Sequence, residues 1–289
     1  MNDVDKTEIK RPAADLAGCE SCPAHNRANL LKLGVNMESW DYVVALAGNP
    51  NTGKSTVFNA LTGLRQHTGN WPGKTVTRAE GGFEYGDKRY KIVDLPGTYS
   101  LLATSLDEQV ARNFILFGQP DVTVVVVDAS RLERNLNLAL QVMEITDRVM
   151  VCLNLIDEAK RHGLTVDERR LARDLGVPVV PTSARYNQGM EALLEAIHQV
   201  AVGEVRPKPR RIQTVSKSLN SVIEHLEKQV LALHPNLPNA RWVALRLLDG
   251  DEDIIKSLRN GDLGELIPLE TLEDRQLSVQ QSMEVERVR

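Results

Sequence analysis

Apolar residues between about positions 43 and 202 of this 289-residue chain form short continuous runs that alternate with segments of helical period. Runs without in/out alternation are typical of strands that are covered on both faces. We expect five such strands, at residues 43–47, 92–95, 122–127, 149–153 and 177–180. A hairpin at residues 81–90, turning at Gly86-Asp87, adds an antiparallel edge strand. The pattern predicts an α/β domain with a mostly parallel six-stranded sheet and helices on both faces.

The pattern changes after a stiff, charged stretch with two prolines at residues 206–211. Beyond it, apolar residues recur at helical spacing on one stripe, which predicts a long amphipathic helix packed into a core: Leu219, Val222, Ile223, Leu226, Val230 and Leu233. Residues 242–248, which include Trp242, supply another apolar helix face, and residues 253–258 begin a third short helix. This part therefore reads as a small all-helical domain.

We divide the chain into an N-terminal extension (1–39), an α/β domain (40–204), a helical domain (205–275) and a polar tail (276–289). The 35 basic and 39 acidic residues give a net charge of −4, so no cationic excess attracts nucleic acid. Three cysteines make no disulfide framework, and Cys152 lies in a strand of buried type. Because there is no secretory segment and no apolar run near 18 residues, we expect a soluble, cytosolic chain.

Residues 48–55, Gly-Asn-Pro-Asn-Thr-Gly-Lys-Ser, follow the first strand directly and form a complete phosphate-binding loop. Gly48 and Gly53 permit the tight turn, and the helix that follows directs its positive end toward phosphates. Lys54 would reach the β- and γ-phosphates, and the Ser55 hydroxyl would bind Mg²⁺. The sequence therefore predicts a nucleoside triphosphate site.

Three further motifs follow in order at strand ends. Asp94 and Gly97 form a DxxG element, in which the carboxylate holds the magnesium shell and the glycine N–H senses the γ-phosphate. Asn154 and Asp157 form an NxxD element, whose carboxylate can accept two hydrogen bonds from guanine but not from adenine. Residues 182–185 offer a backbone N–H to the carbonyl oxygen of the base. Together these motifs favour GTP over ATP.

Five segments of the chain resemble the FeoB ferrous-iron transporter family. They are residues 48–63, the Gly-Asn-Trp-Pro-Gly segment 69–73 with Thr75, and residues 94–101, 154–157 and 242–248. The resemblance covers about residues 42–275. It implies a Ras-like P-loop GTPase domain joined to a GDI-like helical domain. In that family a polytopic membrane domain follows, so we expect this chain to be the soluble N-terminal region of a longer protein at the cytoplasmic face of the bacterial inner membrane.

Carried over position by position, the resemblance makes Thr75 the first-switch threonine, with its hydroxyl on Mg²⁺ beside Ser55 and Asp94. Residues 94 to about 105 become the second switch. It implies catalytic roles for Asn51, Lys54, Thr75 and Gly97. A K⁺ ion would be held by Asn51 with the carbonyls of Gly69 and Trp71. The whole set expected to contact GTP, GDP and Mg²⁺ is Asn49, Asn51, Thr52, Gly53, Lys54, Ser55, Thr56, Gly73, Thr75, Asp94, Gly97, Asn154, Asp157, Ser183, Ala184 and Arg185.

Three positions depart from common GTPase or family patterns. Thr98 stands where many GTPases have glutamine, so no amide orients the attacking water and we expect slow intrinsic hydrolysis. Leu155 replaces the lysine of the commoner NKxD form, which predicts relaxed purine selectivity. Lys74 sits where the family commonly has an apolar residue, which bears on how readily the first switch orders.

Cys19, Cys22 and His25 form a CxxC motif with a nearby histidine. Such a group offers three ligands to a metal or a site of redox control, but a closed zinc site needs four ligands. A reduced pair without function is the other interpretation, and the sequence leaves both open.

Two functions of different class remain at this stage. The favoured one is a GTPase whose switch state is coupled to Fe²⁺ uptake by its own membrane domain, with homo-oligomers and small cytosolic Feo accessory proteins as further partners. The alternative is a stand-alone nucleotide-dependent binding module, such as a ribosome-assembly GTPase. That module should carry a basic patch with exposed aromatics or a recognisable RNA-binding motif in its second domain. The helical domain shows neither, and the protein is acidic.

Overall fold

Within the described residues of the computed structural model, seven strands form one sheet in the order β2-β3-β4-β1-β5-β6-β7. The structure describes residues 27, 30–31, 33–63, 66–72, 74–102, 105–211, 216–233, 237, 239–252 and 254–256. The strands are β1 (Tyr42–Gly48), β2 (Gln66–Asn70), β3 (Thr77–Tyr85), β4 (Lys88–Asp94), β5 (Val122–Asp128), β6 (Val149–Asn154) and β7 (Val179–Pro181). Strands β4, β1, β5, β6 and β7 run parallel, and β3 is antiparallel to β4 and β2.

The predicted α/β class is confirmed, with one strand more than the six expected. The additional strand is β2, whose sequence Gln-His-Thr-Gly-Asn has no apolar residue to signal it. The predicted hairpin turns at Gly86, which has φ 61°, and its second arm is the interior strand β4. The antiparallel strand β3 therefore lies one place in from the edge, and β2 covers it.

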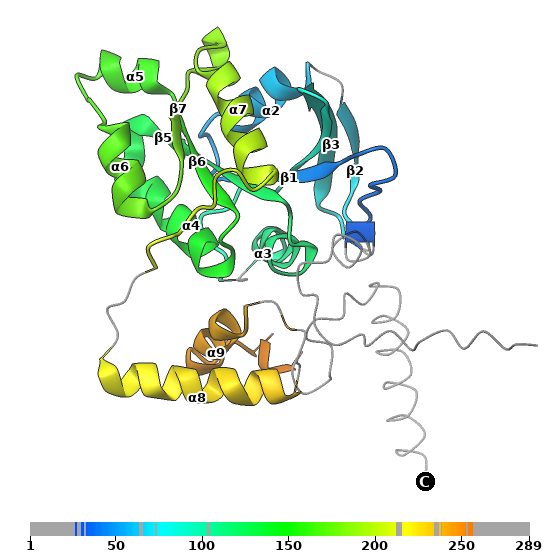
Figure 1. Ribbon diagram of the computed structural model, residues 1–289, viewed down its shortest axis with the longest axis vertical. Coiled ribbons are helices and arrows are strands. Elements are labelled where there is room, and N and C mark those ends of the chain that lie inside the picture. The colour runs from blue at the N-terminus through cyan, green and yellow to red at the C-terminus, as the bar shows by residue number, and fades with distance from the viewer. Residues whose placement is uncertain are drawn as a thin grey trace, which may run out of the picture.

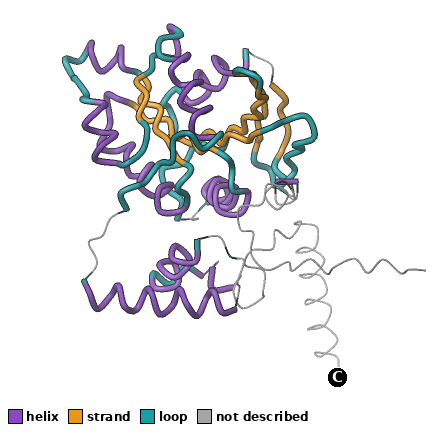
Figure 2. Tube along the Cα trace, viewed as in Figure 1, coloured by secondary structure: helices purple, strands orange, loops and turns teal. Residues whose placement is uncertain are grey.

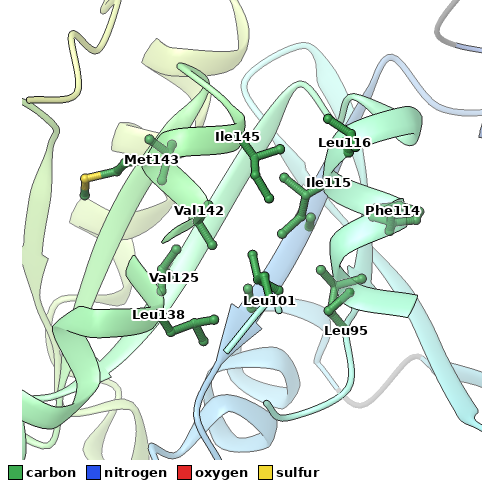
Figure 3. Close-up of a cluster of buried hydrophobic side chains, with 14 of the residues drawn as sticks. Leu95, Leu101, Phe114, Ile115, Leu116, Val125, Leu138, Val142, Met143 and Ile145 are labelled. Atoms are coloured by element: carbon green, nitrogen blue, oxygen red, sulfur yellow. The ribbon is translucent and has the colours of Figure 1, made fainter. Parts of the chain in front are cut away.

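Helices cover both faces of the sheet (Figures 1 and 2). On one face, α2 (Lys54–Thr62) and α7 (Met190–Ala201) bury their apolar sides against alternate residues of β1, β4, β5 and β6. On the other, α3 (Leu106–Gly118) and α4 (Leu132–Ile145) bury Phe114, Ile115, Leu138 and Val142 (Figure 3). The shorter elements are η1 (Ala129–Arg131), α5 (Ile156–Arg161), α6 (Glu168–Leu175) and η2 (Ala184–Tyr186). Cys152, predicted to lie in the core, is fully buried, and burial raises the pKa of its thiol to about 12.

The helices α8 (Lys217–Leu233) and α9 (Ala240–Leu248) pack against each other beyond α3 and α4 (Figure 1). Trp242 is buried as predicted, and Val230 and Trp242 belong to the same cluster as Phe114. The predicted stripe on α8 divides, because Ile223 and Val230 are buried whereas Leu219, Val222 and Leu233 are exposed. Residues 254–256 of the predicted third helix are helical, and the predicted tail 276–289 lies outside the described residues.

Polar side chains attach the helical part to α4. The side-chain amide of Asn239 donates to the carbonyl oxygens of Glu144 and Ile145, at 2.6 Å each, where α4 ends. The Arg211 guanidinium donates to the carbonyl oxygen of Met143 at 3.0 Å. These bonds satisfy carbonyl groups that have no partner within the helix. No helix among the residues described is long and apolar enough to cross a membrane.

Candidate functional site: a phosphate loop and base-recognition loops at one edge of the sheet

The loop from Gly48 to Gly53 connects β1 to α2, and it is so tight at these two glycines that neither position has room for a side chain. A Cβ atom on Gly48 would lie 2.8 Å from the carbonyl oxygen of Val126, and one on Gly53 would lie 2.4 Å from Nδ2 of Asn154. Gly53 also has φ 79°, in the left-handed region that favours glycine. The first helical residue is Lys54, so the N–H groups of the first turn face the loop. This geometry fits a phosphate group.

Lys54 is largely buried at the loop, with its side chain 11% exposed, and it pairs with Asp94 at the end of β4. Lys54 is the cation that we expect to contact the β- and γ-phosphates, and Asp94 is the carboxylate that we expect to hold the magnesium shell. The ion pair brings these two groups together. Burial raises the pKa of the Asp94 carboxyl, and the positive charge of Lys54 offsets part of that rise. Ser55 and Thr56 are exposed on the first turn of α2. The oxygen atoms of Ser55 and Asp94 are the ligands that Mg²⁺ prefers.

The DxxG segment runs directly beside the phosphate loop. The N–H of Thr98 donates to the carbonyl oxygen of Gly48 at 3.3 Å, and Leu95 N–H donates to Leu46 at 3.0 Å. A Cβ on Gly97 would lie 3.6 Å from the backbone of Pro50. The Gly97 backbone is therefore close enough to the loop to respond to what the loop binds.

Asn154 connects the phosphate loop to both base-recognition motifs. Its side-chain N–H group donates to the carbonyl oxygen of Thr52 at 3.0 Å. Its side-chain oxygen accepts from the N–H of Ala184 at 3.1 Å and from the hydroxyl of Thr182 at 3.2 Å. All of these atoms are buried, so the three segments hold one another in fixed positions.

Asp157 lies in the first turn of α5, beside the loop that follows β7. The Ser183 hydroxyl donates to Oδ1 of Asp157 at 2.6 Å, and Arg161 contacts Oδ2 at 3.2 Å. The Ser183 hydrogen bond lowers the pKa of Asp157, and the charge of Arg161 acts in the same direction. The carboxylate is therefore ionised at neutral pH and oriented, as an acceptor for two guanine donors must be. Arg185 is exposed next to Ala184.

The loop that contains Thr75 joins β2 to β3. Ala79 is opposite Asp94 in the sheet, so the start of β3 and this loop lie at the same edge as the phosphate loop. Thr75 is exposed, whereas Trp71 is buried with its ring edge against Phe114, 5.4 Å between centroids. Gly69 lies within β2, and Asn51 is exposed in the phosphate loop with φ 66°.

Some predicted site residues fall outside the described chain. These are Gly73, Cys19, Cys22 and His25. Among the residues that are described, no three His, Cys, Asp or Glu side chains form a group that could hold a metal ion.

A cavity of about 520 Å³ adjoins the phosphate loop, a volume typical of small-molecule sites. Its lining is Asn51, Asp128, Ser130, Arg131, Leu155, Glu158 and His162. Leu155 has φ 62°, a conformation that a leucine rarely adopts and that clusters at functional sites. The sequence analysis did not select Asp128, Arg131 or Tyr99, which lines a smaller adjoining space with Arg134. The signals in the sequence were weak: Asp128 ends strand β5, Arg131 follows that strand, and Tyr99 follows the DxxG motif.

The phosphate loop, the DxxG segment and the NxxD segment thus lie at one edge of a mostly parallel sheet, which defines a P-loop GTPase domain. A helical part follows it. Family models agree: "Ferrous iron transport protein B" matches residues 42–197, and "FeoB cytosolic helical domain" matches residues 213–286. The chain belongs to the ferrous iron transport protein B family.

Individual relatives show the same likeness. The Fe(2+) transporter FeoB of Shigella flexneri is 41% identical over 212 residues, which are 72% of this chain and 27% of that protein. The cytosolic domain of L. pneumophila FeoB has a TM-score of 0.69 at 36% identity, covering 79% of this chain and 88% of that one. The cytosolic domain of T. maritima FeoB in a GDP form has a TM-score of 0.69 at 37% identity, covering 76% and 84%. The chain spans about a quarter of the length of the curated relatives it matches.

Proposed function

We propose that this chain binds GTP and hydrolyses it slowly to GDP and phosphate, as the cytosolic region of a ferrous-iron transport protein. The observation that carries the proposal is the hydrogen-bonded position of Asn154. It ties the phosphate loop at Thr52 to the base-recognition loop at Ala184. One side chain thereby fixes the distance between the phosphate site and the base site, as a binder of a whole nucleotide requires. Membership of a family named for ferrous iron transport supports the proposal that the whole protein transports Fe²⁺, and it disfavours a role in ribosome assembly.

In the proposed mechanism, the backbone N–H groups of residues 51–56 bind phosphate oxygens, and Lys54 leaves Asp94 to contact the β- and γ-phosphates. The residues fit magnesium, which Ser55, Thr75 and Asp94 would hold and which would neutralise charge on the phosphates. Gly97 N–H would contact the γ-phosphate, so that losing the phosphate releases both switch loops. Asp157 would accept from guanine, while Ser183, Ala184 and Arg185 would line the base on its other side.

Potassium is part of the same proposal. Asn51, with the carbonyls of Gly69 and Trp71, would hold K⁺ and supply the positive charge that an arginine finger supplies elsewhere. Asn51 is exposed at the loop and so is accessible to an ion. Thr98 is buried beside Gly48 and has no amide to orient a water molecule, which is why the intrinsic rate is slow.

We infer that a G domain (40–204) is followed by a helical domain (205–275) that transmits the switch state to a membrane domain beyond this chain. The whole protein would move Fe²⁺ across the bacterial inner membrane, with this region on the cytoplasmic face. Homo-oligomers and small cytosolic Feo proteins are further proposed partners, and Cys19, Cys22 and His25 are a proposed metal or redox site.

The experiment compares binding and turnover of GTP and ATP in K⁺ and in Na⁺, with Asn51→Ala and Asp157→Ala. We expect GTP to be preferred, turnover to be faster in K⁺, and each variant to lose one of these properties. Equal rates in K⁺ and Na⁺ would remove the potassium site. Absence of heat with both GDP and a GTP analogue in calorimetry would overturn the nucleotide site itself.

A further inference from the structure

The segment before β1 packs onto the sheet domain, although the family model begins only at residue 42. We call residues 30–31 and 33–40 of this segment the N-terminal strap. Leu30, Val35 and Met37 are buried in the same cluster as Trp71 and Phe114. In Figure 1 the strap is the blue segment that passes beside β2 and β3 before it enters β1. Family membership therefore does not account for this part of the core.

The strap contacts the base of the loop that contains Thr75. The guanidinium of Arg78, in β3, donates to the carbonyl oxygen of Leu33 at 3.0 Å. Gly34 has φ 80°, and a Cβ there would lie 2.6 Å from Nη1 of Arg78 and 2.9 Å from Cγ of Pro72. There is no room between the strap and these two residues, so the strap cannot move toward Arg78 and Pro72 without displacing them.

A buried charge network holds the same contact. Glu80 lies between Arg78, at 2.9 Å from its Nε, and Lys91, at 2.5 Å from its Nζ. The Lys91 ammonium also donates to the carbonyl oxygen of Asn36 at 3.0 Å. Carbonyl oxygens of the strap thus accept one hydrogen bond from each of two largely buried cations. Removing the strap would take these carbonyl partners away from Arg78 and Lys91, which is unfavourable for buried charged donors. The strap is therefore held at one defined position along the sheet.

The other side of Arg78 faces Trp71. Its guanidinium carbon lies 5.4 Å from the centre of the indole ring, within cation–π range. Trp71 N–H donates to the carbonyl oxygen of Val76 at 2.9 Å, and Lys74 N–H donates to Trp71 at 3.0 Å. The loop is therefore closed at its base, and Thr75 lies in the exposed part between the two anchored ends.

We propose that the N-terminal strap positions the first switch, by fixing Trp71, Pro72 and Arg78 so that only the short segment around Thr75 has to become ordered on Mg²⁺–GTP. The inference rests on the proposed function. A loop whose two ends are already fixed loses less conformational entropy when a ligand orders it. The strap therefore favours the triphosphate complex, which needs Thr75, and leaves the affinity for GDP unchanged.

The test is Gly34→Ala, with Gly86→Ala as the matched control. Both glycines have positive φ, at 80° and 61°, but a Cβ at Gly86 has no atom within 4 Å. Affinities for Mg²⁺ with GDP and with a non-hydrolysable GTP analogue are measured by calorimetry. We expect Gly34→Ala to weaken analogue binding by about tenfold, the cost of ordering roughly one more residue. GDP affinity in Gly34→Ala, and both affinities in Gly86→Ala, should stay within about twofold, less than the cost of ordering one residue.

If the ratio of GDP affinity to GTP-analogue affinity is unchanged in Gly34→Ala, the proposal that the strap positions the first switch is wrong. If Gly34→Ala does not fold, Arg78→Lys replaces it, because lysine keeps the charge beside Glu80 but cannot both donate to Leu33 and lie over Trp71. Hydrogen exchange supplies a second measurement: the amides of Trp71 and Lys74 should exchange faster in the strap variant, and unchanged exchange would contradict the proposal. Failure of the unaltered chain to bind any nucleotide would instead refute the proposed function.

Discussion

Lys54 and Asp94 form an ion pair across the phosphate loop, 40 positions apart in the sequence. Each is therefore held by the other where, in the proposed complex, both would face phosphate and magnesium. The pair keeps a buried carboxylate next to a positive charge, which limits the cost of its burial. Binding of a nucleotide has to replace this pair with new partners.

The first prediction concerns pH. Because burial raises the pKa of Asp94, the folded protein binds a proton more readily there than the unfolded chain does. Stability contributed by this group is then greatest at low pH and falls as pH rises from the ordinary value of 3.8 through the raised pKa. The affinity for a GTP analogue with Mg²⁺ should change in the opposite direction and fall toward acid pH, because a protonated Asp94 carboxyl cannot help to hold the magnesium shell. Calorimetry from pH 5 to 8 measures it, and Asp94→Asn should remove that part of the pH dependence.

The second prediction concerns the turn. Gly53→Ala places a Cβ 2.4 Å from the Asn154 amide at φ 79°, so the loop must deform. We expect nucleotide affinity to fall by about a hundredfold or more, since the Asn154 bond to Thr52 is lost as well. Gly63→Ala, at the other end of α2 with φ 58° and no neighbour within 4 Å, is the control. Equal affinities of the two variants for GDP would contradict the assigned role of the loop.

The third prediction tests the base. In Asp157→Asn one acceptor becomes a donor, so guanine's amine loses its partner while a carbonyl at that position gains one. We expect GDP affinity to fall by about a hundredfold and xanthosine diphosphate to bind better than GDP. Competition against a fluorescent nucleotide measures both. Asp174→Asn, at an exposed carboxylate on α6, should change neither affinity. An unchanged guanine preference in Asp157→Asn would show that another group selects the base.

The fourth prediction concerns the attachment of the helical part. Asn239→Ala removes the N-cap of α9 and leaves the carbonyls of Glu144 and Ile145 without this donor. We expect the free energy of unfolding to fall by about 2 kcal/mol, from one lost cap and two lost hydrogen bonds. Urea unfolding followed by circular dichroism measures it. Asn137→Ala, at an exposed position of α4, is the control and should change stability by less than about 0.5 kcal/mol.

Much of the sheet was predictable because its buried strands are continuous apolar runs, which need no knowledge of their neighbours. β5 and β6 match the predicted residues within one position. β7 is shifted to Val179–Pro181, because pairing with Val151 and Leu153 of β6, and not hydrophobicity, sets its ends. β2 could not be predicted, since its polar residues are held by pairing with β3. The α8 stripe shows the reverse case, in which regular apolar spacing at Leu219 and Leu233 does not produce burial.

The sequence by itself determined the phosphate loop and the order of the motifs at the strand ends, because tight turns and buried strands depend on residues adjacent in the chain. Only the tertiary structure decided that Asn154 joins Thr52 to Ala184, that Lys54 pairs with Asp94, and that the N-terminal strap lies against Arg78. Those contacts depend on strand register and on the packing of segments far apart in sequence. The local pattern of polar and apolar residues carries no information about either.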